Sequence, residues 1–277
     1  MAKLTSVQNP RIKQAVRLRN GRSRRRLGRM LIDGIREIHR AHRSGMSIIE
    51  VFWCPTGDRR PEQAQVLQAL VDDHVSVFEV TEPVFEKLAF GQRSEGLVAV
   101  AQTPKWDLDR LDIPSEGLVA VLEGIEKPGN VGAVLRSADA AGVAAVILAD
   151  EGTDLFNPNA IRASLGAIFS VPVATAPGRQ VLDWLRHHGF SIYAAWLDGS
   201  KKYSQVNYGG RSAVILGSEA IGLSSLWRAS DITQIRIPMQ GVVDSLNVSA
   251  TAAVLFYEAL RQKTASSPYD IVRKPRP

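Results

Sequence analysis

Short apolar runs alternate with amphipathic stretches along most of the chain, and this alternation predicts its strands and helices. Near the N-terminus, apolar positions recur at helical spacing through Met30, Ile35, Ile38 and Ala41, and the expected helix ends at Gly45. Strand-like and helical stretches then alternate up to residue 102, which indicates a small α/β unit. The predicted strands are residues 48–53, 75–80 and 96–102, and the predicted helices are residues 62–73 and 82–90.

A second alternation follows residues 103–117, where two prolines and alternating acids are typical of a linker. Its apolar runs are short, and helical segments separate most of them, so they predict a mostly parallel sheet covered on both faces. Ligands of such sheets bind beyond the carboxyl ends of the strands. The predicted strands are residues 118–124, 144–150, 169–174, 190–196, 213–219 and 234–239.

The stretch SLNVSATAAVLFYEAL, residues 245–260, opens on polar residues and continues as an apolar helix. Asp244, Ser245 or Asn247 is expected to cap that helix, because the first backbone N–H groups of a helix lack intrahelical partners. One cap needs one polar residue, so the cluster leaves open whether it is an ordinary capped core helix or part of a site. The residues expected on its buried face, by steps of three and four, are Leu246, Ala250, Ala253, Val254, Tyr257 and Leu260.

The composition is that of a globular protein, with 45% hydrophobic and 22% charged residues. No apolar stretch reaches the roughly 20 residues of a membrane span, and no apolar signal-peptide core follows the basic N-terminus. Cys54 is the only cysteine, which excludes an internal disulfide, and the five histidines lack metal-ligand spacing. A cytoplasmic protein without a bound metal is expected.

Charge is distributed unevenly along the chain. Residues 1–43 hold thirteen Lys and Arg against Asp33 and Glu37, a net charge of +11, whereas the whole chain carries +6. A basic block is typical of nucleic-acid-binding arms, because each cation that neutralises a phosphate releases a counterion. A solvated, disordered tail is the alternative. The arginines expected to bind RNA are Arg22, Arg24, Arg25, Arg26 and Arg29.

Three loops of the second alternation carry candidate chemistry. After the first strand, glycines at 129 and 132 permit a tight turn around Asn130, and Arg136 follows on the new helix. Such a turn before a helix resembles an anion site, but the dinucleotide fingerprint G-x-G-x-x-G is absent. The second loop, residues 216–224, holds Glu219 between two glycines, where a carboxylate would also suit the start of a helix. The third loop, residues 237–249, leads into the last helix.

In order, these loops read N-x-G followed by Arg136, L-G-x-E-x-x-G-L at residues 216–223, and I-P-M at 237–239 followed by S-L-N-V-S. This order resembles the SpoU/TrmH branch of the SPOUT superfamily, RNA ribose 2′-O-methyltransferases that use S-adenosylmethionine. The resemblance covers residues 117–263. The family often has Asn-Pro before the key asparagine, and this chain has Lys127-Pro128-Gly129 while keeping Asn130.

The resemblance implies an α/β fold whose C-terminal SPOUT-type parallel sheet contains a deep trefoil knot, preceded by a smaller L30e-like α/β domain that binds the RNA substrate. The implied organisation is a basic arm (1–29), the L30e-like domain (30–104), a linker (105–116), the methyltransferase domain (117–263) and a disordered tail (264–277). A homodimer formed through the knotted domain is also implied.

The resemblance also implies the residues of the site. The family's catalytic positions fall on Asn130, Arg136, Glu219, Ser245 and Asn247, and its S-adenosylmethionine positions fall on Leu216, Gly217, Ile237, Met239 and Leu246. In the family the motif-one arginine is proposed to activate the ribose hydroxyl. A guanidinium seldom gives up its proton, so we expect Arg136 to hold the substrate phosphate and stabilise the developing alkoxide instead.

The expected function is therefore 2′-O-methylation of RNA, with ribosomal RNA favoured by the separate N-terminal domain. Transfer RNA is the alternative substrate. A non-catalytic RNA-binding factor is the alternative class, against which the intact catalytic set argues. A Rossmann enzyme acting on a small metabolite lacks its glycine fingerprint here and leaves the basic segment unexplained.

Overall fold

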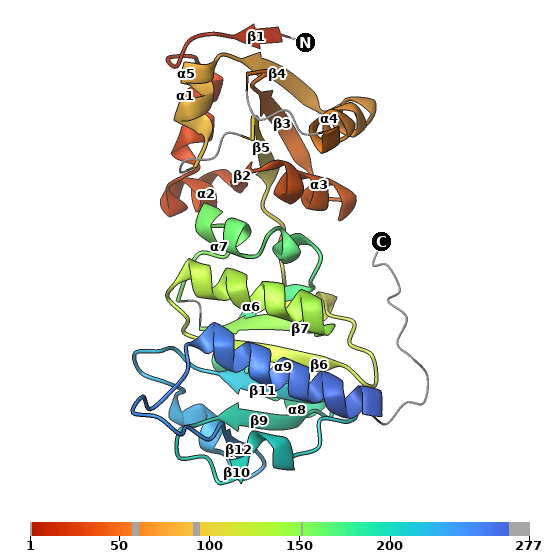
Figure 1. Cartoon of the computed structure of the whole chain (residues 1–277), viewed down its shortest axis with the longest axis vertical. Helices are drawn as coiled ribbons and strands as arrows, with labels where there is room; N and C mark the ends of the chain where they lie inside the picture. Colours follow the sequence, from red (N-terminus) through yellow and green to blue (C-terminus); the bar gives the residue numbers. More distant parts are fainter. Residues whose placement is uncertain (1, 57–60, 91–94, 151, 266–277) are drawn as a thin grey trace. The chain divides into compact units, whose positions relative to one another are not determined.

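The computed structural model describes residues 2–56, 61–90, 95–150 and 152–265 (Figure 1). The chain divides into two compact units. Unit 1 comprises Met1–Lys105 and Asp154–Ser170, and unit 2 comprises Trp106–Thr153 and the chain from Val171 onward. The tail predicted to be disordered began at residue 264, but Thr264 and Ala265 belong to the last helix, and the residues from 266 on lie outside the described ranges. The domain boundaries given above stay predictions.

Unit 1 is built on a five-stranded mixed sheet with the order β1-β4-β3-β5-β2. Strands β1, β4 and β3 are parallel, and β5 runs antiparallel to both β3 and β2. Helices α1 and α5 pack together on one side, and α3 and α4 pack together on the other (Figure 1). The strands are β1 (Ala2–Leu4), β2 (Arg29–Asp33), β3 (Ile48–Trp53), β4 (Ser76–Val80) and β5 (Leu97–Gln102).

The basic segment of unit 1 is helical. Asn9 caps α1 (Pro10–Arg17) and Asn20 caps α2 (Gly21–Leu27), each by accepting a backbone N–H two residues on at 2.9 Å. Helix α2 ends at Gly28 in the left-handed conformation. The other helices of unit 1 are α3 (Ile35–Arg43), α4 (Pro61–Asp72), α5 (Glu82–Leu88) and α7 (Pro158–Ala163), followed by the 3-10 turn η2 (Ala167–Phe169).

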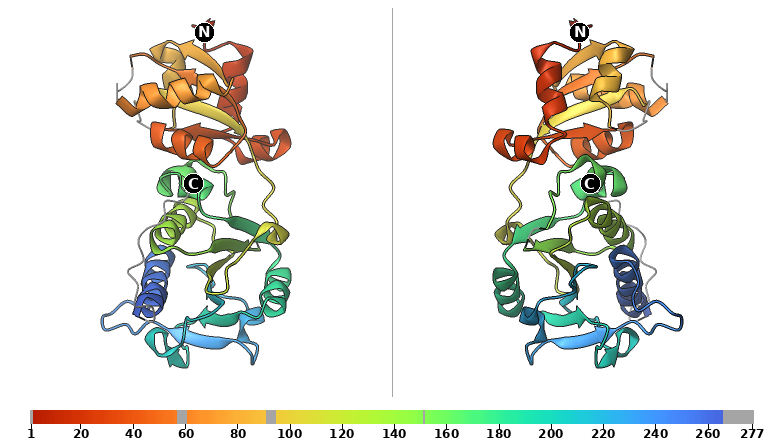
Figure 2. Two further views of the ribbon diagram at one scale, coloured as in Figure 1. Left: turned by 90° about the vertical axis from the view of Figure 1, so that its right-hand side faces the viewer. Right: turned by 90° about the vertical axis from the view of Figure 1, so that its left-hand side faces the viewer.

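Unit 2 is built on a seven-stranded parallel sheet with the order β10-β12-β9-β11-β6-β7-β8. The apolar runs predicted a mostly parallel sheet and six of these strands, all except β10. Helices α6 and α9 lie side by side on one face of the sheet and α8 lies on the other (Figure 2). The strands are β6 (Leu118–Glu123), β7 (Ala145–Ala149), β8 (Val173–Ala176), β9 (Ser191–Ala195), β10 (Lys201–Lys202), β11 (Ser212–Leu216) and β12 (Thr233–Arg236). The helices are α6 (Pro128–Ala141), α8 (Gly178–His187) and α9 (Val248–Ala265), with 3-10 turns η1 (Leu108–Arg110), η3 (Tyr203–Gln205) and η4 (Ser225–Arg228). Within the described ranges, no helix is both long and apolar enough to cross a membrane.

Two predicted helices differ from the structure. The helix expected from Met30 begins only at Ile35, because Arg29–Asp33 pairs with β5 as strand β2. The face of α9 expected to be buried is also wrong: Tyr257 is 51% exposed and Leu246 is 37% exposed. The residues of α9 that are buried are Val248, Ala252, Leu255, Phe256 and Ala259.

Candidate active site

The candidate site lies where the topology of the unit 2 sheet reverses. Strand β6 is the first strand of unit 2 in the chain, and it pairs with β7 on one side and with β11 on the other. The chain therefore builds outward from β6 in both directions, and the carboxyl ends of β6 and β11 lie side by side. Ligands of open parallel sheets bind at such a reversal.

Hydrogen bonds join three of the five predicted catalytic residues at this edge. Oε1 of Glu219, in the loop after β11, accepts from Nδ2 of Asn130 and, at 3.0 Å, from Nδ2 of Asn247. Nδ2 of Asn247 also lies 3.4 Å from Oδ1 of Asn130. Asn130 belongs to the first turn of α6, and Asn247 immediately precedes α9. Segments 117 residues apart thus converge on one carboxylate.

Asn247 is also the cap of α9. Its Oδ1 accepts from the backbone N–H of Ser249 at 2.9 Å and from the Ser249 hydroxyl at 2.6 Å. Its backbone carbonyl accepts from Thr251 at 2.9 Å. The two ends of one amide therefore have separate tasks, since Oδ1 starts the helix and Nδ2 reaches Glu219.

The remaining two predicted catalytic residues stand apart from this hydrogen-bonded cluster. Arg136 projects from α6 and is exposed, and its side chain makes no hydrogen bond or ion pair with any residue that the structure describes. Its guanidinium is therefore available to an external anion. Ser245 is exposed and lines the cavity described next.

A cavity of about 1000 Å³ opens beside the cluster, within unit 2. Its walls come from the loops after β11 and β12, together with residues 195–198 after β9 and the first turns of α9. Glu219 lines it as well, so the cluster and the cavity share a carboxylate. The lining includes all five predicted cofactor residues: Leu216, Gly217, Ile237, Met239 and Leu246.

Two parts of this wall were missed by the reading of the sequence. Trp196, Leu197 and Asp198 follow β9, and Thr251 and Leu255 belong to α9. The first group could have been found, because β9 is a parallel neighbour of β11 and its carboxyl end must share the same edge. Thr251 and Leu255 carried no signal, since small or apolar residues in a helix of this kind normally pack in a core.

The loop after β11 is a tight turn that requires glycine. A Cβ on Gly217 would lie 2.3 Å from the carbonyl carbon of Gly222, which is too close for any side chain. Gly222 has a φ of +69°, and its N–H donates to the carbonyl of Ser218 at 2.9 Å. The two glycines close the turn on itself, and Glu219 lies between them.

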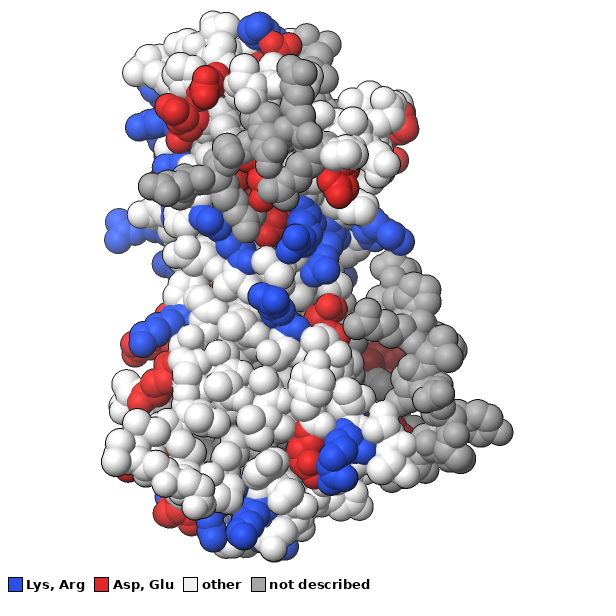
Figure 3. All heavy atoms as spheres, viewed as in Figure 1, with Lys and Arg blue, Asp and Glu red and all other residues white. Residues whose placement is uncertain are grey.

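The predicted RNA-binding arginines differ in how far their side chains are exposed to solvent. Arg22, Arg25 and Arg26 are exposed on α2, and Arg29 is partly exposed at the start of β2. Lys and Arg side chains gather over the part of unit 1 that holds α2 and α3 (Figure 3).

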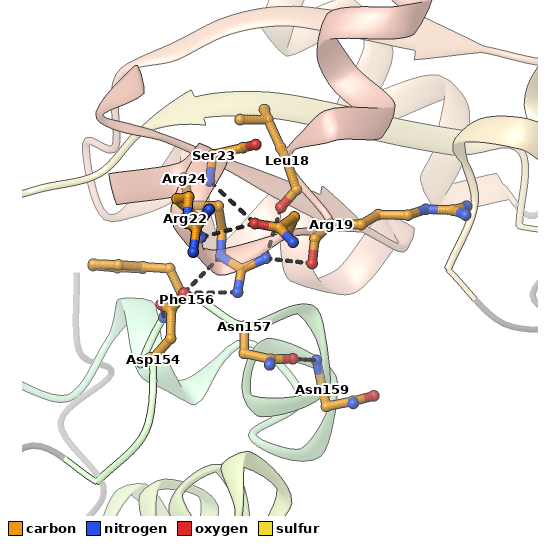
Figure 4. Close-up of polar contacts among 10 residues, drawn as sticks. Leu18, Arg19, Arg22, Ser23, Arg24, Asp154, Phe156, Asn157 and Asn159 are labelled. Atoms are coloured by element: carbon orange, nitrogen blue, oxygen red, sulfur yellow. Dashed lines mark hydrogen bonds and ion pairs between the residues drawn. The ribbon is translucent and has the colours of Figure 1, made fainter. Parts of the chain in front are cut away.

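Arg24 is a correction to the predicted set, because its side chain is only 3% exposed. Its Nε and Nη2 donate to Oδ2 of Asp154 at 2.9 and 2.7 Å, and its Nη1 donates to the carbonyls of Leu18 and Arg19 at 2.7 and 2.8 Å (Figure 4). The guanidinium is thus occupied by the protein itself and does not face an RNA phosphate. Arg24 belongs to the fold of unit 1.

These observations define a class of protein. A cavity that combines glycine and apolar residues with polar and charged ones, at the reversal of a parallel sheet, suits a nucleoside-containing cofactor. The rim supplies amide and carboxylate groups, and the exposed arginines supply the charge that attracts a polyanion. These features are compatible with the S-adenosylmethionine-dependent RNA methyltransferases that the sequence motifs resemble.

Comparison with known proteins confirms this class and gives the family. Residues 117–257 match the SpoU rRNA Methylase family, and residues 9–99 match the MRM3-like substrate binding domain. The chain belongs to the SpoU rRNA methylase family. It is an S-adenosylmethionine-dependent RNA ribose 2′-O-methyltransferase.

Relatives extend over nearly the whole chain. The 23S rRNA (uridine(2479)-2′-O)-methyltransferase of Streptomyces viridochromogenes is 28% identical over 96% of both chains. A crystal structure described as an RNA 2′-O ribose methyltransferase is 41% identical, with a TM-score of 0.83 over 95% of this chain and 99% of that chain. The rRNA methyltransferase of Sinorhizobium meliloti with bound AdoMet is 27% identical, with a TM-score of 0.84 over 94% and 97%. The trefoil knot expected from the family stays a prediction.

Proposed function

We propose that the protein methylates a ribose 2′-hydroxyl of 23S ribosomal RNA, using the Asn130–Glu219–Asn247 cluster and Arg136. The observation that carries this proposal is that Glu219 is shared by the cluster and the cavity. Relatives that span nearly the full chain are named for 23S rRNA, which supports ribosomal RNA over transfer RNA.

The cavity has the size and lining that S-adenosylmethionine requires. Leu216, Gly217, Ile237, Met239 and Leu246 would hold it, chiefly through backbone groups and apolar contact. When bound, S-adenosylmethionine supplies an electrophilic methyl group. The protein then has to align the ribose oxygen and assist the loss of its proton.

Arg136 is the residue we assign to the substrate. Its exposed guanidinium would bind the phosphate next to the target ribose and stabilise negative charge on the 2′-oxygen as the proton leaves. Glu219 and the two asparagines would orient the substrate, because their amide and carboxylate groups are already fixed to one another. Ser245 would contribute a hydroxyl at the cavity wall.

Unit 1 would supply affinity for RNA. Exposed Arg22, Arg25 and Arg26 present charge from one short helix. Contacts of this kind position an RNA without reading its sequence. An enzyme that acts on ribosomal RNA would work in the cytoplasm.

We also infer a homodimer formed through unit 2. Several large apolar side chains around the cavity loops and α9 are exposed, as is typical of a surface that a partner covers. They are Ile221 at 86%, Val242 at 100%, Val243 at 58% and Tyr257 at 51% exposure.

The test is methyl transfer from labelled S-adenosylmethionine to unmodified ribosomal RNA, followed by alkaline digestion. A 2′-O-methyl group blocks cleavage at its own ribose, so label in alkali-resistant dinucleotides is the expected result. Label released in single nucleotides would mean base methylation and would refute the proposed chemistry. Transfer RNA, assayed in parallel, should accept no label.

A further inference from the structure

Glu123, the last residue of β6, is a buried carboxylate with an unusual set of partners. It is only 6% exposed and lies at the edge of the sheet where the active site forms. Its Oε2 accepts from the backbone N–H of Ser224 at 2.7 Å. Its Oε1 accepts from the Ser224 hydroxyl at 2.7 Å and from Nε1 of Trp227 at 2.8 Å. Burial of a carboxylate is costly unless such donors surround it, so this arrangement is specific.

All three donors come from one short segment, which follows the loop of Glu219. Trp227, within η4, is completely buried in the core of unit 2. The near end of the loop is fixed as well, because Leu216, the last residue of β11, pairs with Leu122 of β6. Consecutive residues of β6, Leu122 and Glu123, therefore hold the two ends of the loop.

Between these two anchors the loop has little freedom. Ser218 accepts from Gly222 through its carbonyl and from the Ile221 N–H through its hydroxyl, at 2.9 and 3.2 Å. Glu219 projects from this closed turn into the cluster with the two asparagines, while Gly217 lines the cavity. A shift of the Ser224 anchor would move both the carboxylate and the cavity wall.

Glu123 also begins the turn that leads to Asn130. The loop after β6 and the loop after β11 are thus joined twice, by Glu123 inside the protein and by Asn130 at the rim. The buried junction is formed by a charged acceptor with three donors, whereas the rim junction is solvent-exposed. The buried junction is accordingly the one that sets the spacing of the two loops.

We propose that Glu123 is a positioning residue of the methyltransferase, which anchors the 217–224 loop so that Glu219 and the cofactor wall are held in register. The part that concerns turnover rests on the proposed role of Glu219. The part that concerns cofactor affinity rests on the cavity wall alone.

Glu123→Gln in the full-length protein tests this assignment. Glutamine has the same shape, but its amide nitrogen would face a donor from Ser224 or Trp227. At an assay temperature well below the unfolding midpoint, we expect S-adenosylmethionine to bind about tenfold more weakly, as measured by calorimetry. We also expect kcat on ribosomal RNA to fall at least about tenfold. Glu123→Asp keeps the charge and should recover part of both. Asp112→Asn, which removes an exposed carboxylate of the same unit, is the matched control and should change neither.

The indole N–H of Trp227 gives a readout of the anchor itself. Its NMR signal, assigned with Trp227→Phe, should lose its downfield shift and exchange faster with water in Glu123→Gln. Ser224→Ala tests the anchor independently, in case Glu123→Gln does not fold. It removes one donor and leaves the carboxylate, so cofactor affinity and kcat should each fall by a smaller factor of about threefold.

Two results would overturn the proposal. One is a lower unfolding temperature in Glu123→Gln with unchanged cofactor affinity and kcat, which would make Glu123 a core residue only. The other is full activity and cofactor affinity in Ser224→Ala, whether or not Glu123→Gln folds. If Glu219→Gln alone retains full kcat, the proposed role of Glu219 fails, whereas weaker cofactor binding in Glu123→Gln would still support the anchor.

Discussion

Replacing Arg24 with methionine is expected to destabilise unit 1 without removing an RNA contact. The substitution deletes two donors to Asp154, whose side chain is 17% exposed, and two donors to the carbonyls of Leu18 and Arg19. Methionine fills a similar volume and leaves no large cavity, so the loss of stability comes from the missing charge and hydrogen bonds. Asp154 still accepts a hydrogen bond from the backbone N–H of Phe156 at 3.0 Å, but it loses its ion pair with Arg24.

The magnitude follows from the burial of both partners. Removal of one member of a buried ion pair typically costs about 3–5 kcal/mol, because the other charge stays behind without compensation. For a unit of this size, that corresponds to a fall of about 10–20 °C in the unfolding midpoint. Arg24→Met combined with Asp154→Asn should recover part of the loss, because the uncompensated carboxylate is then gone.

The assay compares Arg24→Met with Arg25→Met, an exposed neighbour on the same helix. Arg25→Met should leave the unfolding midpoint within about 2 °C, since surface substitutions rarely exceed about 0.5 kcal/mol. If Arg25 contacts a phosphate, its loss should lower the salt dependence of RNA binding by about 0.7–0.9 in the logarithmic slope. The reasoning is refuted if Arg24→Met unfolds like the wild type and shows the reduced slope in place of Arg25→Met.

Substitutions at three further positions give expected outcomes. Asn247→Asp keeps the α9 cap but brings a second carboxylate against Glu219. We therefore expect kcat to fall at least about tenfold, while the unfolding midpoint stays close to that of the wild type. Asn247→Ala removes the cap as well, so it should also lower the free energy of unfolding by about 1 kcal/mol. Gly217→Ala places a Cβ against the backbone of Gly222 and should weaken S-adenosylmethionine binding more than tenfold by calorimetry; wild-type affinity would show that the turn opens freely. The pKa of Glu258 lies below its ordinary value of 4.5 because Arg261 hydrogen-bonds to it, so this carboxylate stabilises the fold above that pH and the stability is lost as pH falls through the lowered pKa. Glu258→Gln should therefore lose less stability than the wild type between about pH 5 and about pH 3, as measured by thermal unfolding.

Most of the parallel sheet of unit 2 was predictable from the sequence, because strands such as β6, β7 and β11 are buried on both faces and read as continuous apolar runs, whereas the exposed Lys201–Lys202 of β10 gave no such signal. The positions of the three loops followed, since carboxyl ends of parallel strands share one edge. The burial of α9 was not predictable in the same way. Small and apolar residues occur on all sides of this helix, so their spacing alone does not distinguish the face that packs against the sheet from the face that carries Tyr257.

Errors in unit 1 have a different physical origin, which is pairing between distant residues. Met30 and Leu31 fit a helical spacing, yet their backbone pairs with Ala101 and Val100 of β5. Arg24 cannot be told from its neighbours by composition, because its burial depends on an aspartate 130 residues away. The segment Asp154–Ser170 belongs to unit 1 although it joins two strands of unit 2. None of these partners leaves a local signal.

The polar residues before α9 were interpreted either as an ordinary helix cap or as part of a site, and Asn247 does both. Serine or aspartate at position 247 would cap the helix about as well as asparagine does. Neither could also donate to Glu219, because serine is too short to reach it and aspartate has no donor when ionised. Asparagine alone offers an acceptor for the helix and a donor for the site on one planar group. The start of α9 and the position of Glu219 are therefore linked through the same side chain, which ties the orientation of the Asn130–Glu219–Asn247 cluster to the packing of the last helix.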